Sequence, residues 1–369
     1  MRRKKVCIIT SAHGPFDDRI FHKEGMSLAR EGYEVVLVAP HDRAETVNGI
    51  TIIPLPKTGS RIRRIILTTL RVLLIAARVR ADVYHLHDPE LLTAGLLMKI
   101  LGRKRVIYDV HEDYETKILS KEWIRKEART VLSKIIVSIE RISGKLFDYV
   151  LTADSHIKMK FSSRTEVIAN YPPLSFMTET RRHNNGTLKV IYIGGIAQDR
   201  GSKVMLETMK YLKDVDMELH LLGKIGDERE AADFMSTGKV VYHGFVPWQE
   251  VNGYLAGADA GLLLLQPTPS YVNCTGEGVI KLFEYMSMEL PVIVSDFPLL
   301  KNLITGIGCG ICVDPADPEK VAGALKYLYH NPGLRKEMGE KGRRAVMNKY
   351  NWENESKKLL EIYQRVCPA

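Results

Sequence analysis

Residues 276–298 read GEGVIKLFEYMSMELPVIVSDFP, and this stretch decides the expected fold. A glycine-bounded polar loop leads into a short predicted helix that carries Lys281 and Glu284, and an apolar strand follows. This order is typical of α/β folds that bind phosphorylated ligands, because unpaired N–H groups at a helix start attract anions. Lys281 would add a positive charge, and Glu284 could accept hydrogen bonds from ribose hydroxyls. The alternative is a solvated helix whose Lys and Glu pair three residues apart, for about 0.2–0.5 kcal/mol.

The same alternation of strand and helix runs through the whole chain, which is typical of parallel sheets covered by helices. In the first half we expect strands over residues 6–12, 34–40, 50–56, 83–88, 105–111 and 149–154. In the second half we expect strands over residues 189–195, 218–224, 240–246, 260–266, 291–296 and 309–314. The sequence therefore predicts an α/β protein with two doubly wound, Rossmann-like domains.

The predicted domain boundary lies within residues 170–186, which are polar, contain proline and end in glycine, as linkers do. The length of 369 residues supports two domains, because single cores stop growing at about 250–300 residues. We expect an N-terminal domain over residues 1–170 and a C-terminal domain over residues 187–349. Helical spacing continues at the C-terminal end of the chain, at Trp352, Leu359, Leu360 and Tyr363.

Composition places the chain among ordinary globular proteins, with 45% hydrophobic and 26% charged residues. The sequence has no uncharged apolar run of about 18 residues, and MRRKK leads directly into VCIITSA without a signal-peptide layout. We therefore expect a cytoplasmic protein. Its five cysteines are odd in number and sparse, which favours reduced thiols. Cys309 and Cys312 form a single C-x-x-C, expected as part of a small-residue strand rather than a zinc or redox site.

Most of the net charge of +9 lies near the N-terminus, where residues 1–80 hold 15 Lys and Arg against 7 Asp and Glu. Residues 61–80 read RIRRIILTTLRVLLIAARVR and carry six arginines and no acid. Arg64, Arg71 and Arg78 stay on one helical face, with a drift of only about 20° per heptad. The predicted opposing apolar stripe consists of Ile62, Ile65, Ile66, Leu70, Leu73 and Ala77.

This basic helix fits two structures equally well. One is a core-packed helix with a solvated basic side. The other is a helix that faces anionic lipid, where each basic group near the surface adds about 1 kcal/mol. A second basic row points to the same lipid surface and consists of Lys117, Lys121, Arg125 and Arg129. No nucleic-acid partner is expected, because the chain shows no recognised nucleic-acid module.

Polar residues gather where the predicted strands of the first half end, which is where doubly wound sheets bind ligands. The first strand leads into SAHGPFDDRIFHKE, in which Gly14 permits close backbone approach unless the loop is only a surface turn. His85 and His87 share one strand face, as do Asp109 and His111. This clustering permits a metal site. Without a helical H-x-x-x-H pair or a cysteine partner, structural hydrogen bonding is the expected role of His85.

The C-terminal half contains motifs that resemble the donor-binding signature of retaining family-4 glycosyltransferases of the GT-B fold. Residues 281–286, KLFEYM, fit one branch of that family closely, and the similarity covers nearly the whole chain. The resemblance implies a cleft between the two domains and a final helix that returns to the N-terminal domain, so that residues 350–369 join it. It also implies transfer of a hexosyl unit from a nucleotide diphosphate sugar, most simply UDP- or GDP-linked, without a metal or another cofactor.

The resemblance assigns sugar and ribose contacts to the loop and helix at residues 276–286. The family has two glutamates eight positions apart, and the second, which binds ribose, corresponds to Glu284. Gly276 stands at the first position, and Glu277 lies one residue out of register. Either the loop shifts to present Glu277, or backbone groups of Gly276, Gly278 and Val279 hold the donor sugar.

The resemblance also assigns the diphosphate contacts. The family carries Gly-Arg and then Lys-Gly after the first strand of the second domain, where this chain reads IYIGGIAQDRG. Gly195 replaces the arginine, and Arg200 with Gly201 occupies the second position. Lys281 could supply the missing charge, and Lys203 is a weaker candidate. The loss of one phosphate cation without a replacement would weaken stabilisation of the leaving group.

In the N-terminal domain the resemblance assigns His111 to the donor sugar, with polarisation of the transition state, and Gly14 to the donor. Further candidates for orienting His111 or for contacting the acceptor are His13, Arg19, His87, Asp88 and Glu112.

The implied acceptor is a saccharide or a lipid-linked saccharide in cell-surface glycan synthesis, and the basic helix at residues 61–80 suggests attachment to the inner face of the membrane. Two other functions stay open. A nucleotide-sugar 2-epimerase shares the fold, and the departures at Gly195 and Glu277 also fit a catalytically silent subunit that binds a nucleotide sugar.

Overall fold

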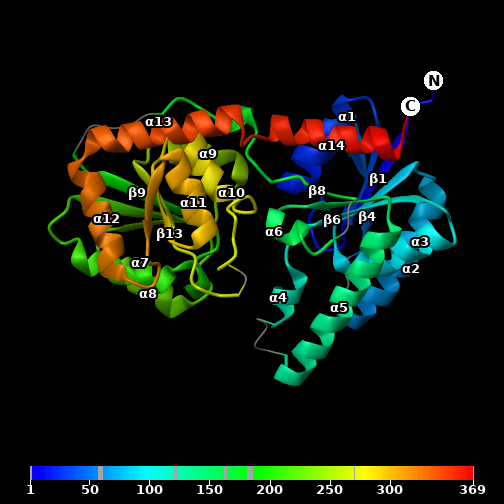
Figure 1. Ribbon diagram of the computed structural model, residues 1–369, viewed down its shortest axis with the longest axis horizontal. Helices are drawn as coiled ribbons and strands as arrows, with labels where there is room; N and C mark the ends of the chain where they lie inside the picture. The colour runs from blue at the N-terminus through cyan, green and yellow to red at the C-terminus, as the bar shows by residue number, and fades with distance from the viewer. Residues whose placement is uncertain are drawn as a thin grey trace. The chain divides into compact units, whose positions relative to one another are not determined.

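The computed structural model describes residues 2–56, 61–119, 124–161, 164–180, 186–269 and 271–368, without the side chains of residues 61–66 and 228. The chain divides into two compact units (Figure 1). Unit 1 comprises Met1–Asn170 and Glu353–Ala369, and unit 2 comprises Tyr171–Trp352. The sequence had placed the domains at residues 1–170 with 350–369, and at residues 187–349.

Within the described residues, unit 1 has an eight-stranded sheet in the order β3-β4-β2-β1-β5-β6-β7-β8. Its strands are β1 Lys5–Ile9, β2 Glu34–Pro40, β3 Glu45–Val47, β4 Ile50–Leu55, β5 Val83–Leu86, β6 Arg105–Val110, β7 Tyr149–Thr152 and β8 Thr165–Val167. The pairing of β3 with β4 is antiparallel, and the pairings of the other strands are parallel. In the central strand β1, Val6 to Ile9 are fully buried, as expected for a parallel strand covered on both faces.

Helices cover both faces of this sheet. They are the π-helix η1 Asp18–Gly25, α1 Met26–Arg30, α2 Arg61–Val79, the 3-10 turn η2 Pro89–Leu91, α3 Leu92–Ile100, α4 Tyr114–Leu119, α5 Lys126–Leu146, α6 Ser155–Lys158 and α14 Trp352–Val366. Figure 1 shows α2, α3 and α5 on one face and α1 and α14 on the other. The C-terminal helix therefore completes unit 1.

Unit 2 repeats the architecture. Within the described residues its six strands are parallel and ordered β11-β10-β9-β12-β13-β14. They are β9 Leu188–Ile193, β10 Met217–Leu222, β11 Val240–Gly244, β12 Ala260–Leu263, β13 Val292–Ser295 and β14 Gly310–Val313. The helices are η3 Leu174–Phe176, η4 Gln198–Arg200, α7 Ser202–Thr208, η5 Met209–Tyr211, α8 Glu228–Ser236, α9 Trp248–Ala256, α10 Ile280–Ser287, α11 Pro298–Ile307, α12 Pro318–His330 and α13 Pro332–Asn348.

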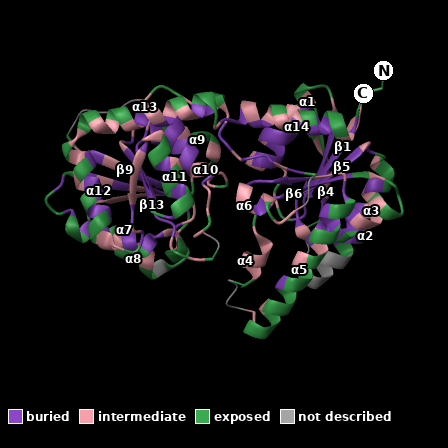
Figure 2. Cartoon of the chain, in the orientation of Figure 1, coloured by how far each residue is buried: buried purple, intermediate pink, exposed green. Residues whose placement is uncertain are grey.

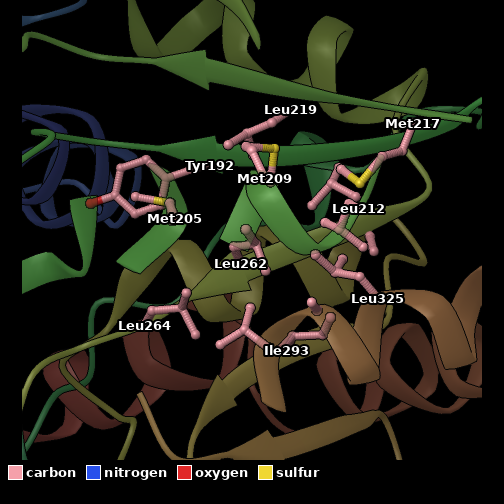
Figure 3. Close-up of a cluster of buried hydrophobic side chains, with 14 of the residues drawn as sticks. Tyr192, Met205, Met209, Leu212, Met217, Leu219, Leu262, Leu264, Ile293 and Leu325 are labelled. Carbon is pink, nitrogen blue, oxygen red and sulfur yellow. The ribbon is translucent and has the colours of Figure 1, made fainter. Parts of the chain in front are cut away.

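Aliphatic and methionine side chains fill the space between sheet and helices in unit 2. Leu219, Leu262 and Ile293, from three strands, meet Met205 and Leu325 from helices on one face (Figure 3). Figure 2 shows that in each unit the strands are buried and the covering helices are exposed on their outer sides.

The predicted doubly wound α/β class is confirmed, and each of the twelve predicted strands has a counterpart among the described residues. The sequence did not predict β3 and β8. Each is three residues long, so neither contains the apolar alternation from which a strand is recognised. Pairing with β4 and β7 forms them instead.

The predicted orientation of the basic helix α2 was wrong. Leu70, expected in the core, is 55% exposed, whereas Thr68, Thr69, Val72 and Ala76 form the buried face. Leucines lie on nearly every side of this helix, so periodicity could not identify the buried side. Of the predicted arginine row, Arg71 is half-buried and Arg78 is exposed; Arg64, Ile62, Ile65 and Ile66 have side chains outside the described residues.

The second predicted basic row is not continuous. Lys117 lies on α4 and Arg129 on α5, which are separate helices, and Lys121 lies outside the described residues. Within that part of the chain, no helix is both long and apolar enough to span a membrane. All five cysteines are free thiols, and burial raises the pKa of Cys309 to about 12, as suits a residue beside a packed strand.

Candidate active site

In unit 2, two cationic side chains approach the backbone turn that follows β9. The Nζ atom of Lys281, in the first turn of α10, lies 3.2 Å from the Tyr192 hydroxyl and 4.3 Å from the centre of its ring. Tyr192 donates a hydrogen bond to the carbonyl of Gly195 at 2.8 Å. The turn lies at the carboxyl end of β9, beside β12 and thus where the strand order reverses, which is the usual ligand position in such sheets.

Glycines make this approach feasible. Gly194 has a φ of +107°, and a Cβ atom there would lie 2.8 Å from Lys281 Nζ. A Cβ atom at Gly195 would lie 3.1 Å from Arg200 Nη1. Arg200 therefore occupies the space beside Gly195, the position at which the family resemblance led us to expect an arginine. The two cations Arg200 and Lys281 flank a turn without side chains.

The charge of Arg200 affects the protonation of Lys281. Removal from water and then repulsion from Arg200 lower the pKa of Lys281 to about 7. Burial would lower the pKa of Arg200, but Tyr271 and other acidic neighbours raise it. An anion bound between the two side chains would relieve their repulsion, and a diphosphate carries enough negative charge to do so.

Glu284 lies one turn further along α10 and is 4% exposed. Its Oε1 accepts a hydrogen bond from Trp248 Nε1 at 2.7 Å. The Trp248 ring stacks on Phe176 with centroids 5.3 Å apart. The sequence predicted Glu284 as a ligand-binding carboxylate but did not predict this indole partner.

The loop before α10 contains both groups considered for the sugar contacts, the Glu277 carboxylate and the backbone of residues 276–279. Gly276 has a φ of +90°, and a Cβ atom there would lie 2.7 Å from Leu303 Cδ2, so a glutamate does not fit. The amide of Val279 donates to the Gly276 carbonyl at 2.9 Å, which commits it to the turn. The Glu277 carboxylate accepts from Thr275 Oγ1 at 3.3 Å and stays half-buried, and Gly278 is exposed.

In unit 1, Arg19 lies among buried acids beneath the carboxyl ends of β5 and β6. Its Nε atom is 2.9 Å from Glu24 Oε1 and 3.0 Å from Asp109 Oδ2. Its Nη1 donates to the Ile168 carbonyl at 2.7 Å. Burial would raise the pKa of Asp109, but Arg19, followed by His111 and His87, holds it well below its usual range. Burial and Asp109 raise the pKa of Glu24 well above its usual range.

Two histidine contacts connect this cluster to its surroundings. His111 Nε2 lies 2.8 Å from His87 Nδ1. Burial, together with repulsion from Arg19 and His13, lowers the pKa of His111 to about 4, although Asp109 opposes the shift. His111 is therefore a neutral ring at pH 7. His85 Nδ1 lies 2.9 Å from the Tyr363 hydroxyl of α14, a structural hydrogen bond of the kind the sequence favoured.

Glu24, His85, His87 and Asp109 have metal-ligating groups close to one another. All four are buried, and the Arg19 guanidinium already places a positive charge against both carboxylates. The charge balance of the cluster therefore does not require a metal ion.

Both halves of the chain match known family models. Residues 25–167 match the model described as glycosyltransferase family 4, and residues 176–345 match the model described as glycosyl transferases group 1. The chain belongs to glycosyltransferase family 4. It is a glycosyltransferase of the GT-B fold, as the sequence predicted.

Individual relatives of this glycosyltransferase are distant. An uncharacterized glycosyltransferase of Methanocaldococcus jannaschii is 25% identical over 181 residues, which span 47% of this chain but only 44% of the relative. An MMP alpha-(1->4)-mannosyltransferase of Mycolicibacterium hassiacum is 21% identical over 328 residues, 85% of this chain and 75% of that protein. A sucrose-phosphate synthase of Thermosynechococcus elongatus superimposes with a TM-score of 0.80 at 15% identity, over 99% of each chain.

The acceptor-side candidates of this glycosyltransferase divide by burial. Arg19 and His87 are almost fully buried. Asp88 is 2% exposed and accepts hydrogen bonds from Thr10 Oγ1 and the Ser11 amide. Burial argues against direct acceptor contact by these three side chains. The other predicted role, orientation of His111, fits His87, whose Nδ1 lies 2.8 Å from His111 Nε2. His13 is half-buried and hydrogen-bonded to Asp17, which raises the pKa of His13.

Two further predicted residues of the glycosyltransferase are accessible. Glu112 is exposed and pairs with Lys117. A Cβ atom at Gly14 would have no neighbour within 4 Å, so packing within the chain does not require a glycine there. No site role was predicted for Trp248, Tyr192, Glu24 or Tyr363. Trp248 stands in none of the motifs. Tyr192 and Glu24 stand in quoted stretches, but their site partners Lys281 and His87 lie far away in the sequence.

Proposed function

We propose that the protein is a retaining glycosyltransferase that moves a hexosyl unit from a UDP- or GDP-linked sugar to a saccharide or lipid-linked saccharide in cell-surface glycan synthesis. The observation that carries the proposal is the approach of Lys281 and Arg200 to the turn at Gly194 and Gly195. A lysine whose charged form is destabilised by burial and by Arg200, held beside that arginine, forms a preorganised site for a diphosphate.

The proposed roles follow from these positions. Arg200 and Lys281 stabilise the departing diphosphate, and Gly195 and Gly201 let its oxygens approach the backbone. Glu284 accepts from the ribose hydroxyls, and the loop at residues 276–279 contacts the donor sugar. The neutral His111 contacts the transferred sugar, and acceptor attack on the donor face of the anomeric carbon needs no protein nucleophile. The two side-chain cations take the part of a divalent ion, so the reaction is proposed to be metal-independent.

Thermal-shift screening of UDP-, GDP- and ADP-sugars tests the donor part, because a ligand that binds the native state raises its melting temperature. The stabilising donor is then incubated with saccharide acceptors in the presence of EDTA, and the anomeric configuration of the product is read by NMR. Stabilisation by no sugar nucleotide, or an inverted product, would contradict the proposal. Isomerisation of the donor without an acceptor would identify a 2-epimerase.

Donor affinity is expected to depend on pH through Lys281. Its pKa is about 7 without an anion, and a bound diphosphate favours the charged ammonium and so raises that pKa. Affinity should be constant below pH 6 and fall as the pH rises above 7, by up to about tenfold per pH unit. Isothermal titration calorimetry from pH 6 to 9 measures this slope. The Lys281→Met variant should show none of it, and an equal slope in that variant would contradict the assignment.

We propose that the face formed by α2, α3 and α5 of unit 1 contacts an anionic membrane, where a lipid-linked acceptor would lie. Nearly half of the exposed large apolar side chains in the described residues lie on α2, on α5 or at the end of α3. On α2 they are Leu67, Leu70 and Leu74, and on α5 they are Val131, Leu132, Ile135, Ile142 and Leu146. Both helices pack against α3, and Figure 2 shows much of α5 exposed.

The charges on this face match an anionic surface. On α5 the exposed basic residues are Lys126, Lys134, Arg141 and Lys145, against the single exposed acid Glu127 among the described side chains of that helix. Apolar side chains flanked by lysine and arginine are typical of helices that lie in a membrane interface.

Vesicle co-sedimentation tests this membrane contact. We expect the protein to sediment with phosphatidylglycerol vesicles at low salt, to be released at high salt, and to ignore neutral vesicles. Replacing exposed leucine and isoleucine on both helices, Leu74→Glu with Ile142→Glu, should abolish sedimentation. Met347→Glu, an equally exposed site on α13 of unit 2, is the matched control. Wild-type protein that stays in the supernatant at low salt would contradict the proposal.

A further inference from the structure

We propose that Trp248 is a positioning residue for donor recognition, and that its indole N–H orients the Glu284 carboxylate toward the ribose hydroxyls. The inference rests on the proposed function and adds a residue that lies outside the signature motifs. Its basis is the 2.7 Å hydrogen bond between Trp248 Nε1 and Glu284 Oε1.

The chemistry of the indole N–H, a neutral hydrogen-bond donor, explains why a tryptophan suits this position. A buried carboxylate is unfavourable unless it is hydrogen-bonded, and Glu284 is 4% exposed. An arginine or lysine would satisfy it but would also cancel its negative charge. The indole group is a neutral, donor-only group, and an ionised carboxylate has about four acceptor positions, so a bond from Trp248 is compatible with further bonds from ribose hydroxyls.

The indole ring is itself fixed in place. Trp248 is the first residue of α9, and its ring stacks on the buried Phe176 with an interplanar angle of 27°. Asn252, one turn further along the same helix, donates to the Phe176 carbonyl at 3.4 Å. Phe176 therefore packs along one side of α9, and rotation of the Trp248 ring would break the stack. Because Phe176 fixes the Trp248 ring and Trp248 is hydrogen-bonded to Glu284, the orientation of the Glu284 carboxylate is fixed as well.

The decisive variant is Trp248→Phe, which keeps an aromatic ring against Phe176 and removes only the N–H donor. We expect the donor KM to rise about tenfold or more, as for a lost hydrogen bond to a charged group, while kcat stays within about twofold. In a Glu284→Ala background the same substitution should have almost no further effect, because the two residues act through one contact. A merely structural role would produce the same penalty in both backgrounds and would overturn the inference.

A nucleotide comparison provides a second readout that does not depend on turnover. Calorimetry compares binding of UDP or GDP with binding of the corresponding 2′,3′-dideoxynucleoside diphosphate. Trp248→Phe should weaken binding of the first and leave the second unchanged, and equal weakening of both would overturn the inference. The comparison is made within one variant, so a general loss of fold affects both nucleotides alike. If Trp248→Phe does not fold, Trp248→Leu is measured in the same way.

The failure of this inference is distinguishable from the failure of the proposed function. Wild-type protein that binds no nucleoside diphosphate would overturn the proposed function and this inference with it. Wild-type protein that binds the nucleotide, together with a Trp248→Phe variant of unchanged affinity, would overturn the role of Trp248 alone.

Discussion

Replacing Lys281 by alanine is expected to lower kcat for sugar transfer by about 10²–10³-fold, the usual cost of removing one group that stabilises developing negative charge. Lys281 is held beside the turn after β9 by the hydroxyl and ring of Tyr192. Arg200 cannot compensate, because the space beside Gly195 is already filled by its own guanidinium. Initial rates with saturating donor measure the effect.

Two further variants separate charge from packing. Lys281→Met keeps a long side chain against Tyr192 and should lose nearly as much activity as the alanine variant. Lys203→Ala, at an exposed position in the first turn of α7, should change kcat less than twofold because it removes a lysine from the same domain without touching the turn. Equal effects of Lys203→Ala and Lys281→Ala would mean that only overall charge matters, contrary to the proposed site.

The fold could be predicted from the sequence where the signal is local. Parallel strands such as β1 and β9 are buried on both faces, so each appears as an uninterrupted apolar run. The orientation of α2 could not be predicted in this way, since its buried face is made of Thr68, Thr69, Val72 and Ala76 rather than its largest side chains. Small residues on one side of α2 allow the helix to pack closely against its neighbours. Which side of α2 is buried therefore depends on those neighbouring elements and not on the sequence of the helix alone.

The residues of the candidate site also divide into those that the local sequence predicts and those that it does not. Lys281 and Glu284 were predicted because loop, helix and strand follow one another along the chain. Trp248 was not, because it lies 36 residues from Glu284 and the contact depends on how α9 and α10 pack. Gly276 was recognised as a departure from the family pattern. The structural features that favour glycine there, a φ of +90° and a Leu303 side chain of α11 that would lie 2.7 Å from a Cβ atom, are visible only in the structure.

Arg19 is the clearest case in which sequence position did not reveal the surroundings of a side chain. It follows a glycine-containing loop at a strand end, where an acceptor contact was expected. Its partners Asp109 and Ile168 are 90 and 149 residues away, so no local pattern could reveal that its guanidinium is buried. We therefore expect Arg19 to control the stability of unit 1 rather than binding of the acceptor.

Replacing Arg19 by methionine is accordingly expected to lower the free energy of unfolding by about 3–5 kcal/mol, since removal of one partner leaves buried charge uncompensated. Asp109 and Glu24 would lose their cation, and the Ile168 carbonyl would lose its donor. Urea titration followed by circular dichroism measures the loss.

Adding Asp109→Asn to Arg19→Met should recover part of that stability, because it removes the uncompensated charge itself. Arg43→Met, at an exposed arginine paired with Glu45, is the matched control and should change stability by no more than about 0.5 kcal/mol. Affinity for UDP or GDP, measured by calorimetry well below the unfolding transition, should be unchanged in Arg19→Met, because the proposed ribose and diphosphate contacts lie in unit 2. The opposite result would be an Arg19→Met variant that keeps wild-type stability and loses affinity for the acceptor. That result would support an acceptor role for Arg19.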